Sequence, residues 1–270
     1  MDKKAAAQKV QHRKEKINDA LEVSCMAHRG FSSQAPENTL SAIKKALELP
    51  YVDSIEVDVQ LSKDGIPVVI HDFTLDRTTN GVGYVKYKTF AELRKLDAGR
   101  WFSKDFIGEK IPSLEEVLML TKDKNILLNI ELKTAGELYE GVERAVVALV
   151  KRYKMENKVY LTSYDHEVIR NIKKLKTKIR TGLIIEGNPV LLSEQLENAG
   201  AEIISIKADF LTPKIIMKMM KKNIKIITWT VNDPSQIQYL LQLSKKIGIC
   251  TNYPDRLEAF KSTMTTSKER

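Results

Sequence analysis

The sequence predicts an α/β protein whose strands close into a parallel β/α barrel. Short apolar, β-branched runs alternate with longer helical patterns almost to the C-terminus. This alternation is typical of parallel sheets whose strands are connected by helices. The repeat occupies most of the 270 residues. Such a length favours a closed (β/α)8 barrel, which takes about 250 residues, over a doubly wound sheet.

Nine runs are candidate strands, one more than an eight-stranded barrel needs. They span residues 23–27, 54–61, 67–71, 125–132, 159–163, 179–185, 203–206, 224–230 and 248–251. The turn sequence SKDG at 62–65 favours a hairpin between the second and third runs. The expected surplus therefore lies at this pair of runs, around residues 62–65.

The segments between the strands carry helix signals, with one exception. Leu40, Ile43 and Leu47 follow helical spacing, and the T-x-x-E and S-x-x-E sequences at 89–92 and 113–116 are capping boxes. Residues 73–112 break the alternation, because they are rich in turns and aromatic residues and hold only one short helix pattern. Long loops in compact domains are usually functional or disordered, and the aromatic residues argue against disorder. We expect an insertion over one end of the barrel.

The two ends of the chain differ from this pattern. Residues 1–20 form a basic leader, a candidate amphipathic helix, and residues 263–270 a polar tail, which leaves 21–262 for the barrel. The leader lacks the apolar run of a secretory signal, and no stretch approaches the roughly 18 apolar residues of a membrane span. A cytoplasmic location is the default expectation. Cys25 and Cys250 are expected to be reduced core residues.

The formal net charge of +9 favours anionic partners such as phosphate esters, nucleic acid or an acidic membrane surface. However, the lysines are spread along the chain, as on solvated helix faces. No nucleic-acid-binding motif and no basic–aromatic cluster is present, so nucleic acid is not an expected partner. The sequence leaves peripheral membrane contact open and carries no signal for an oligomeric state.

Polar side chains gather on four consecutive strand runs. Reactive groups of β/α barrels lie at the carboxyl ends of the strands. The first run is followed by His28 and Arg29, the second carries Glu56 and Asp58, the third ends at His71, and the fourth ends with Glu131 and Lys133. Taken singly, each has a structural explanation, such as a hydrogen-bonded histidine or a carboxylate that caps a turn. Their convergence favours one reactive site.

The residue types in this group suit phosphoester cleavage. Glu56 and Asp58 lie two apart on a strand, point to the same side and repel each other unless a cation compensates them. Together with Glu131 they supply the oxygen ligands that one divalent cation, Mg²⁺ or Ca²⁺, requires. Two imidazoles can act as general acid and base, and Arg29 and Lys133 can compensate phosphoryl charge.

At these residues the sequence resembles the glycerophosphodiester phosphodiesterase family. The matching stretches are AHRGFSSQAPENTLSAI, IEVDVQLSKDGIPVVIHDFTLDRTTNGVG, ELRKLDAGRWFS, IPSLEEVL, NIELK, ITWTVND and TNYPDRL, in family order over residues 23–260. The resemblance implies a TIM barrel with a small insertion. It also implies hydrolysis of glycerophosphodiesters, such as glycerophosphocholine and glycerophosphoethanolamine, to sn-glycerol 3-phosphate and an alcohol. The expected route passes through a cyclic phosphate, because the substrate's 2-hydroxyl lies beside the phosphate.

The resemblance also implies roles for individual residues. His28 and His71 look like the acid/base pair, Glu56, Asp58 and Glu131 like the metal ligands, Arg29 and Lys133 like phosphate contacts, and Trp229 like a contact for glycerol or alcohol. Glu37 and Asn38 are expected to support the start of the first helix and Arg29. Asp72, Asp76 and Arg77 are expected to organise the insertion. Asn252 stands where many members have Asp, and it is expected to touch none of the metal ligands.

Two alternatives stay open. A lysophospholipase D-type lipid phosphodiesterase could use the same residues. It would need an apolar groove, for which Met155, Phe210, Met217, Met219 and Met220 are candidates. A non-catalytic scaffold that binds phosphate or a membrane surface could keep the barrel without turnover, but the presence of every expected catalytic residue argues against it.

Overall fold

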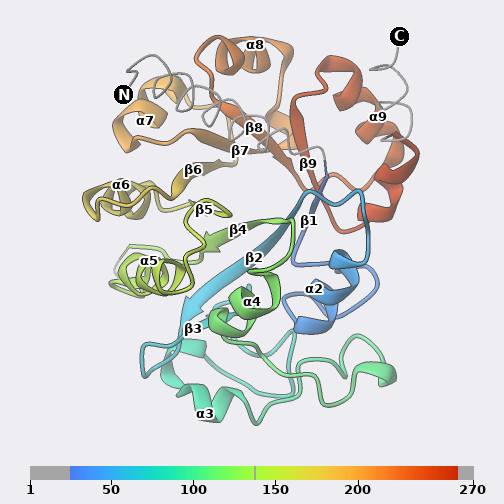
Figure 1. Ribbon diagram of the computed structural model, residues 1–270, viewed down its shortest axis with the longest axis vertical. Helices are drawn as coiled ribbons and strands as arrows, with labels where there is room; N and C mark the ends of the chain where they lie inside the picture. The colour runs from blue at the N-terminus through green and yellow to red at the C-terminus, as the bar shows by residue number, and fades with distance from the viewer. Residues whose placement is uncertain (1–24, 137, 261–270) are drawn as a thin grey trace, which may run out of the picture.

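The computed structural model describes residues 25–136 and 138–260, so the leader at 1–20 and the tail at 263–270 lie outside the described residues. Eight parallel strands form a closed ring in the order β1, β2, β4, β5, β6, β7, β8, β9 and back to β1. Helices cover the outside of this ring (Figure 1). The predicted β/α barrel is confirmed.

The strands are β1 Cys25–Ala27, β2 Ser54–Leu61, β3 Pro67–Val69, β4 Leu127–Leu132, β5 Val159–Ser163, β6 Arg180–Ile185, β7 Ile203–Lys207, β8 Lys225–Trp229 and β9 Ile247–Thr251. The α-helices are α2 Leu40–Leu47, α3 Phe90–Leu93, α4 Leu114–Thr121, α5 Val142–Arg152, α6 His166–Lys174, α7 Leu192–Ala199, α8 Pro213–Lys221 and α9 Pro234–Leu243. Both expected capping boxes are present, at the start of α3 and of α4. Within the described residues, no helix is long and apolar enough to cross a membrane.

The ninth strand, β3, pairs antiparallel with β2, as the SKDG turn predicts. Because β1 has only three residues, it pairs with Ser54 and Ile55 alone, at the start of β2. The far half of the same edge of β2 is taken by β3, which runs back along it. The prediction that the third strand continues to His71 is wrong, because β3 ends at Val69. His71 therefore reaches the barrel mouth on the return leg of a hairpin and not at the end of a barrel strand.

Side chains of the barrel strands divide between two environments. Ile55, Val57 and Val59 belong to the core between the sheet and the helices, where they are fully buried. Inside the barrel, a smaller apolar cluster consists of Met26, Tyr160, Ile203, Ile227 and Cys250, with Trp229 packed against it. Alternate residues of β2 therefore face the barrel interior, which places Glu56 and Asp58 there.

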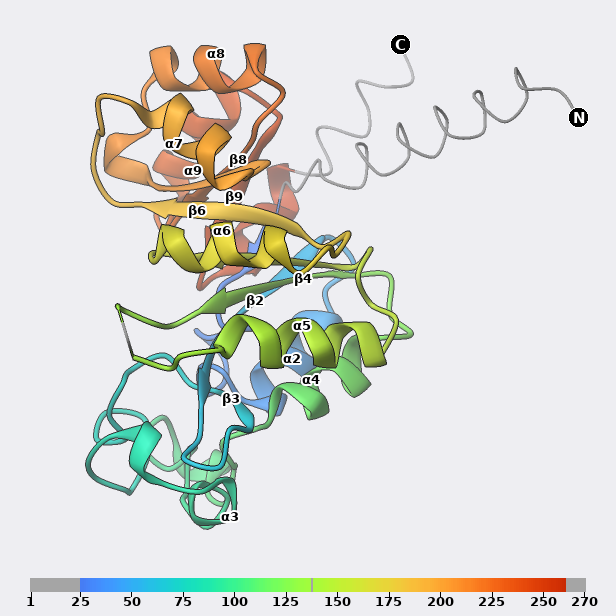
Figure 2. The same ribbon diagram turned by 90° about the vertical axis from the view of Figure 1, so that its left-hand side faces the viewer.

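Residues 73–112 lie between β3 and α4 and pack around a core of their own. This second core contains Val68, Ile70, Leu75, Val85, Leu93, Ala98 and Ile111. Besides α3, the segment holds two 3-10 helices, Val85–Tyr87 and Lys104–Phe106, where the sequence indicated one short helix. It extends from the β3 side of the barrel, at the opposite end of the molecule from α8 (Figure 2).

Candidate active site

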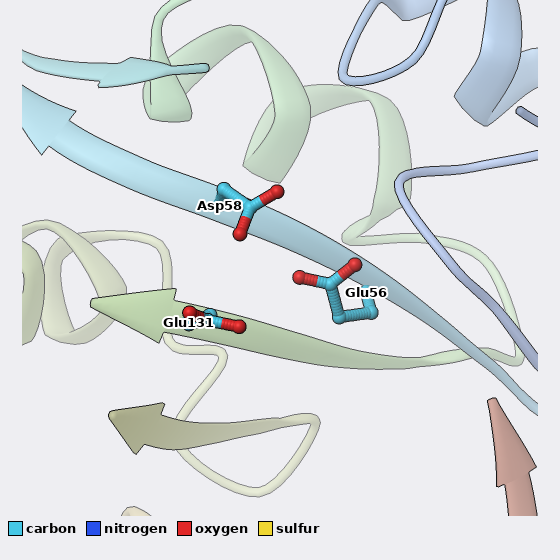
Figure 3. Close-up of side chains that lie close together, drawn as sticks. All are labelled: Glu56, Asp58 and Glu131. Carbon is cyan, nitrogen blue, oxygen red and sulfur yellow. The ribbon is translucent and has the colours of Figure 1, made fainter. Parts of the chain in front are cut away.

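Three carboxylates face one another at the barrel mouth. Glu56 and Asp58 come from β2 and Glu131 from β4, and their side chains point toward a common space (Figure 3). Asp58 and Glu131 are directly paired across the two parallel strands. One oxygen of each residue lies within 4.8 Å of the others. In the part of the chain that the structure describes, this is the only group of three or more such ligands.

Two oxygens of the carboxylate group receive no hydrogen bond, and a divalent cation would supply the missing partner. Glu56 Oε1 and Asp58 Oδ1 are buried and accept no hydrogen bond. Burial, followed by repulsion from Asp58 and Glu131, raises the pKa of Glu56 well above its usual value. Burial and the Asp58 charge raise the pKa of Glu131 to about 7. Buried carboxylates with free oxygens are the ligand set of Mg²⁺ or Ca²⁺, so these residues fit such an ion.

Asp58 differs from the other two carboxylates because cations and an amide hold it. Its burial would raise its pKa, but Arg29, His71 and Lys133 outweigh burial and lower the pKa to about 2. Arg29 Nε lies 3.2 Å from Asp58 Oδ2 without the alignment of a hydrogen bond. Asn38 makes two hydrogen bonds with Asp58. Its Nδ2 donates to Asp58 Oδ2 (2.8 Å), and its Oδ1 accepts from the Asp58 backbone N–H (3.1 Å). Asp58 is therefore the ionised, fixed member of the group.

His28 and Arg29 follow β1 in a sharp turn. Arg29 and Gly30 both have positive φ, 56° and 79°. A side chain at Gly30 would lie 2.6 Å from the carbonyl carbon of Ala42, so the close approach of α2 requires glycine there. The turn directs the Arg29 backbone N–H to Glu56 Oε2 (2.9 Å) and places His28 Nε2 3.9 Å from the same oxygen.

A neutral amide supports His28. Its Nδ1 lies 2.6 Å from Oδ1 of Asn252, the residue that follows β9. Burial, then the Arg29 charge, lowers the pKa of His28 to about 4, although Asp58 and Asn252 oppose this shift. As expected, the hydrogen bonds of Asn252 do not go to the three carboxylates; its partners include His28, Ser32 and Asn232.

A carboxylate supports His71 in place of an amide. Its Nδ1 lies 2.6 Å from Asp72 Oδ1, and its Nε2 lies 3.2 Å from Lys133 Nζ. Lys133 Nζ also donates to Glu131 Oε1 (2.9 Å). Burial lowers the pKa of His71, with Arg29 and Lys133 acting in the same direction and Asp58 opposing them. His71 is therefore tied both to the carboxylate cluster and to the insertion.

Arg77 of the insertion joins the two sides of the site. Its guanidinium donates two hydrogen bonds to Asp72, of 2.7 and 3.0 Å, and two to Glu37, each of 2.8 Å. Glu37 in turn accepts from Arg29 Nη1 at 2.7 Å. The expected contact of Glu37 with Arg29 is present, and of the three residues expected to organise the insertion, Asp72 and Arg77 are bonded to each other. Asp76 lies apart from them, where it accepts from the Gly83 backbone N–H (3.2 Å).

The polar residues line one side of a pocket that encloses about 530 Å³, part of it open to solvent. The other side is largely uncharged and includes Tyr164, Ile184, Ser205, Trp229 and Thr230. Tyr164 and Trp229 make an edge-to-face contact with ring centroids 5.9 Å apart, and Lys133 Nζ lies 5.6 Å from the centroid of Tyr164. The pocket therefore pairs an ionic wall with an aromatic one.

The structure brings together all eight residues that the sequence singled out. Asp58 lies beside Glu56 and Glu131, and the pocket is lined by the other seven, His28, Arg29, Glu56, His71, Glu131, Lys133 and Trp229. Sequence reasoning missed Tyr164, although its position directly after β5 is a signal for a pocket residue. It also missed the contact between Asn252 and His28. The position of Asn252 was the signal for this contact, because Asn252 follows β9, the strand that pairs with β1.

Comparisons with known proteins identify the family of this chain. Residues 28–256 match the Glycerophosphoryl diester phosphodiesterase family. A glycerophosphodiester phosphodiesterase of Caldanaerobacter subterraneus is 39% identical over 234 residues, which cover 86% of this chain and 95% of that protein.

Solved structures give the same result. An Oleispira antarctica phosphodiesterase, in complex with the product sn-glycerol-3-phosphate, is 31% identical with a TM-score of 0.83, covering 87% of this chain and 95% of that one. A glycerophosphodiester phosphodiesterase of Agrobacterium tumefaciens is 30% identical with a TM-score of 0.76, covering 88% and 99%. The chain therefore belongs to the glycerophosphoryl diester phosphodiesterase family and is an enzyme of that family.

Proposed function

We propose that this enzyme hydrolyses glycerophosphodiesters, such as glycerophosphocholine and glycerophosphoethanolamine, to sn-glycerol 3-phosphate and an alcohol, with one divalent cation, Mg²⁺ or Ca²⁺. The observation that carries the proposal is the convergence of three carboxylates, two histidines and two cationic side chains on one pocket. The product bound to the Oleispira relative supports the same reaction. The barrel with its insertion, residues 21–262, is the proposed catalytic unit.

Glu56, Asp58 and Glu131 would hold the cation through their free oxygens. When bound, the cation supplies positive charge that offsets the carboxylates and the charge developing on the phosphoryl oxygens. Arg29 and Lys133 add fixed positive charge on either side of the cluster, where each lies within 4.0 Å of Asp58. In a pocket that excludes much of the water, such charges stabilise a phosphoryl transition state strongly.

His28 and His71 would move the protons. One histidine accepts the proton of the substrate's 2-hydroxyl as its oxygen attacks phosphorus, and the other protonates the alcohol oxygen as its bond to phosphorus breaks. Water then opens the cyclic phosphate, with the two proton transfers reversed. In both histidines Nδ1 is held by a neighbouring oxygen, so the proton transfers are assigned to Nε2, which in His71 also contacts Lys133 Nζ at 3.2 Å. The aromatic wall of Tyr164 and Trp229 would contact the glycerol or the alcohol.

The proposal is tested by following release of glycerol 3-phosphate from both diesters, with and without EDTA. We expect turnover that EDTA abolishes, that Mg²⁺ or Ca²⁺ restores, and that His28→Ala loses. The matched control is His166→Ala, because His166 contacts the Ile184 carbonyl and does not line the pocket. Full turnover in excess chelator would overturn the role of the cation.

The five residues expected to line an apolar groove for a lipid substrate do not form one at the pocket. Met155 and Met219 are buried in the core, Met217 and Met220 are exposed, and none of the five candidates lines the pocket. Lysophosphatidylcholine in the same assay tests this alternative. Release of choline from it, with no reaction of the soluble diesters, would favour a lipid substrate and peripheral membrane contact. No reaction with any of these substrates would favour the binding scaffold. The cytoplasmic location stays a prediction, which cell fractionation tests.

A further inference from the structure

We propose that Asn252 is a positioning residue, whose side-chain oxygen holds the Nδ1 proton of His28 and so presents an unprotonated Nε2 to the pocket. Asn252 Oδ1 lies 2.6 Å from His28 Nδ1, while Nε2, across the ring, lies 3.9 Å from Glu56 Oε2. The inference rests on the proposed function in one respect, because the proposed function is what gives His28 a part in the reaction.

The backbone of Asn252 is fixed on both sides, so its side chain starts from a defined point. Its N–H donates to Asn232 Oδ1 (3.0 Å), and its carbonyl accepts from the Ser33 N–H (3.1 Å). Thr251 Oγ1 donates to the same Asn232 oxygen (3.2 Å), and the Thr251 carbonyl accepts from the His28 N–H (2.9 Å). The ends of β1 and β9 are therefore locked together around this contact.

The chemistry of the contact sets the tautomer of His28. An amide oxygen only accepts hydrogen bonds, so the ring nitrogen that faces it must carry the proton. The Ser32 hydroxyl lies 3.1 Å from the same oxygen and 2.8 Å from the His28 carbonyl oxygen, so it is a second donor on that side. Because the amide is neutral, it fixes the tautomer without a fourth negative charge beside the three carboxylates.

The first test reads the tautomer directly, independently of turnover. Protein labelled with ¹⁵N-histidine and supplied with Mg²⁺ is studied by long-range ¹H–¹⁵N correlation NMR above neutral pH, with His28 assigned by comparison with His28→Gln. We expect the Nδ1–H form in the wild type. A wild-type His28 in the Nε2–H form would overturn the inference without any variant of Asn252.

Three variants separate positioning from a purely structural role. In Asn252→Leu the Nδ1–H form should no longer predominate, and kcat should fall by about 10²-fold with KM changed less than about twofold, within the range of a misplaced general acid or base. Asn252→Asp keeps an acceptor oxygen and should keep the Nδ1–H form. Ser32→Ala removes the other donor from this oxygen and should leave both tautomer and kcat close to wild type.

The outcomes distinguish the inference from the proposed function. An unchanged tautomer in folded Asn252→Leu would overturn the inference even if kcat fell. If His28→Ala kept full turnover, the catalytic role of His28 would fail, while the tautomer measurement would still decide the role of Asn252. If Asn252→Leu did not fold, as judged by circular dichroism, Asn252→Ala would take its place.

Discussion

The two histidines of the pocket are held by different parts of the molecule and by different chemistry. His28 lies on the barrel frame, where β1 meets β9, and a neutral amide holds its Nδ1. His71 lies on the return leg of the β2–β3 hairpin, and a carboxylate fixed by Arg77 of the insertion holds its Nδ1. The His28 side chain is also less exposed, at 15% against 29% for His71.

This difference shows that one site can combine a rigid and an adjustable support. The contact between Asn252 and His28 depends on the pairing of β1 with β9, two barrel strands that pack against the large core between the sheet and the helices. The support of His71 depends on ion pairs of Arg77, whose side chain is 44% exposed. Exposed ion pairs are weaker and more sensitive to salt than buried hydrogen bonds. We therefore expect the His71 side to respond more to changes in solution conditions.

Removal of either imidazole should have the largest effect. His28→Ala and His71→Ala should each lower kcat by about 10²–10⁴-fold, the usual contribution of a general acid or base. The double variant should be nearly as active as the weaker single variant, because the two groups act as a unit. Initial rates on glycerophosphocholine measure this, with His166→Ala as the control. A double variant whose loss is the product of both single losses would show that the two sides act independently.

The carboxylate cluster between the two histidines should affect both sides together. Glu56→Gln should weaken Mg²⁺ binding by at least about tenfold, since even indirect partners of a metal are worth 10–100-fold. Without metal the variant should melt at the same temperature as the wild type or higher, because the amide removes repulsion with Asp58 and Glu131. Calorimetric titration and thermal melts in EDTA measure the two effects.

Glu143→Gln is the control for this substitution, because Glu143 is buried, 6% exposed, but lies outside the pocket. It should leave Mg²⁺ binding unchanged. Wild-type affinity for Mg²⁺ in Glu56→Gln would remove Glu56 from the ligand set.

Arg77→Ala sharpens the comparison, because it should loosen the support of His71 and leave the Asn252 contact of His28 in place. Asp72 and Glu37 each lose two hydrogen bonds, so His71 and Arg29 become less well held. We expect kcat/KM to fall by about tenfold, a loss of about 1.4 kcal/mol in transition-state stabilisation. The tautomer of His28 should not change. Arg170→Ala, which removes an exposed pair with Glu167, is the control and should have wild-type activity. A changed His28 tautomer in Arg77→Ala would mean that the two supports are coupled.

The sequence predicted more about the barrel strands of the site than about the β2–β3 hairpin that leads to His71. Strand alternation placed Glu56 and Asp58 on one face, and the SKDG turn identified the surplus strand, because both signals are local. It did not show that β3 ends at Val69, before His71, since the point where a strand ends depends on how the edge of β2 is shared with β1.

Contacts between distant residues could not be predicted in this way. Asn252 and His28 are 224 positions apart, and Arg77 and Glu37 are 40 apart. Such pairs follow from ring closure and from the path of the insertion, which periodicity and turn chemistry do not specify.

The smallest expected effect is that of Arg77→Ala on stability in acid, and it concerns the support of His71. Hydrogen bonds from Arg77 lower the pKa of Asp72, and they outweigh burial, with help from Arg29, to lower the pKa of Glu37. In the unfolded chain the pKa values of Asp and Glu are about 3.9 and 4.3. A carboxylate with a lowered pKa stabilises the folded state above the unfolded pKa, and this stabilisation is lost as the pH falls through the folded pKa.

The melting temperature of the wild type should therefore exceed that of Arg77→Ala by a constant amount at neutral pH. The difference should shrink as the pH falls below about 4, where the carboxylates of the unfolded chain take up protons while those paired with Arg77 stay ionised. Arg170→Ala should follow the wild type throughout, because it removes only an exposed pair with Glu167. Thermal melts over this pH range measure all three proteins. A difference between wild type and Arg77→Ala that persisted undiminished to about pH 2 would mean that Arg77 stabilises the insertion by packing and not through its carboxylate partners.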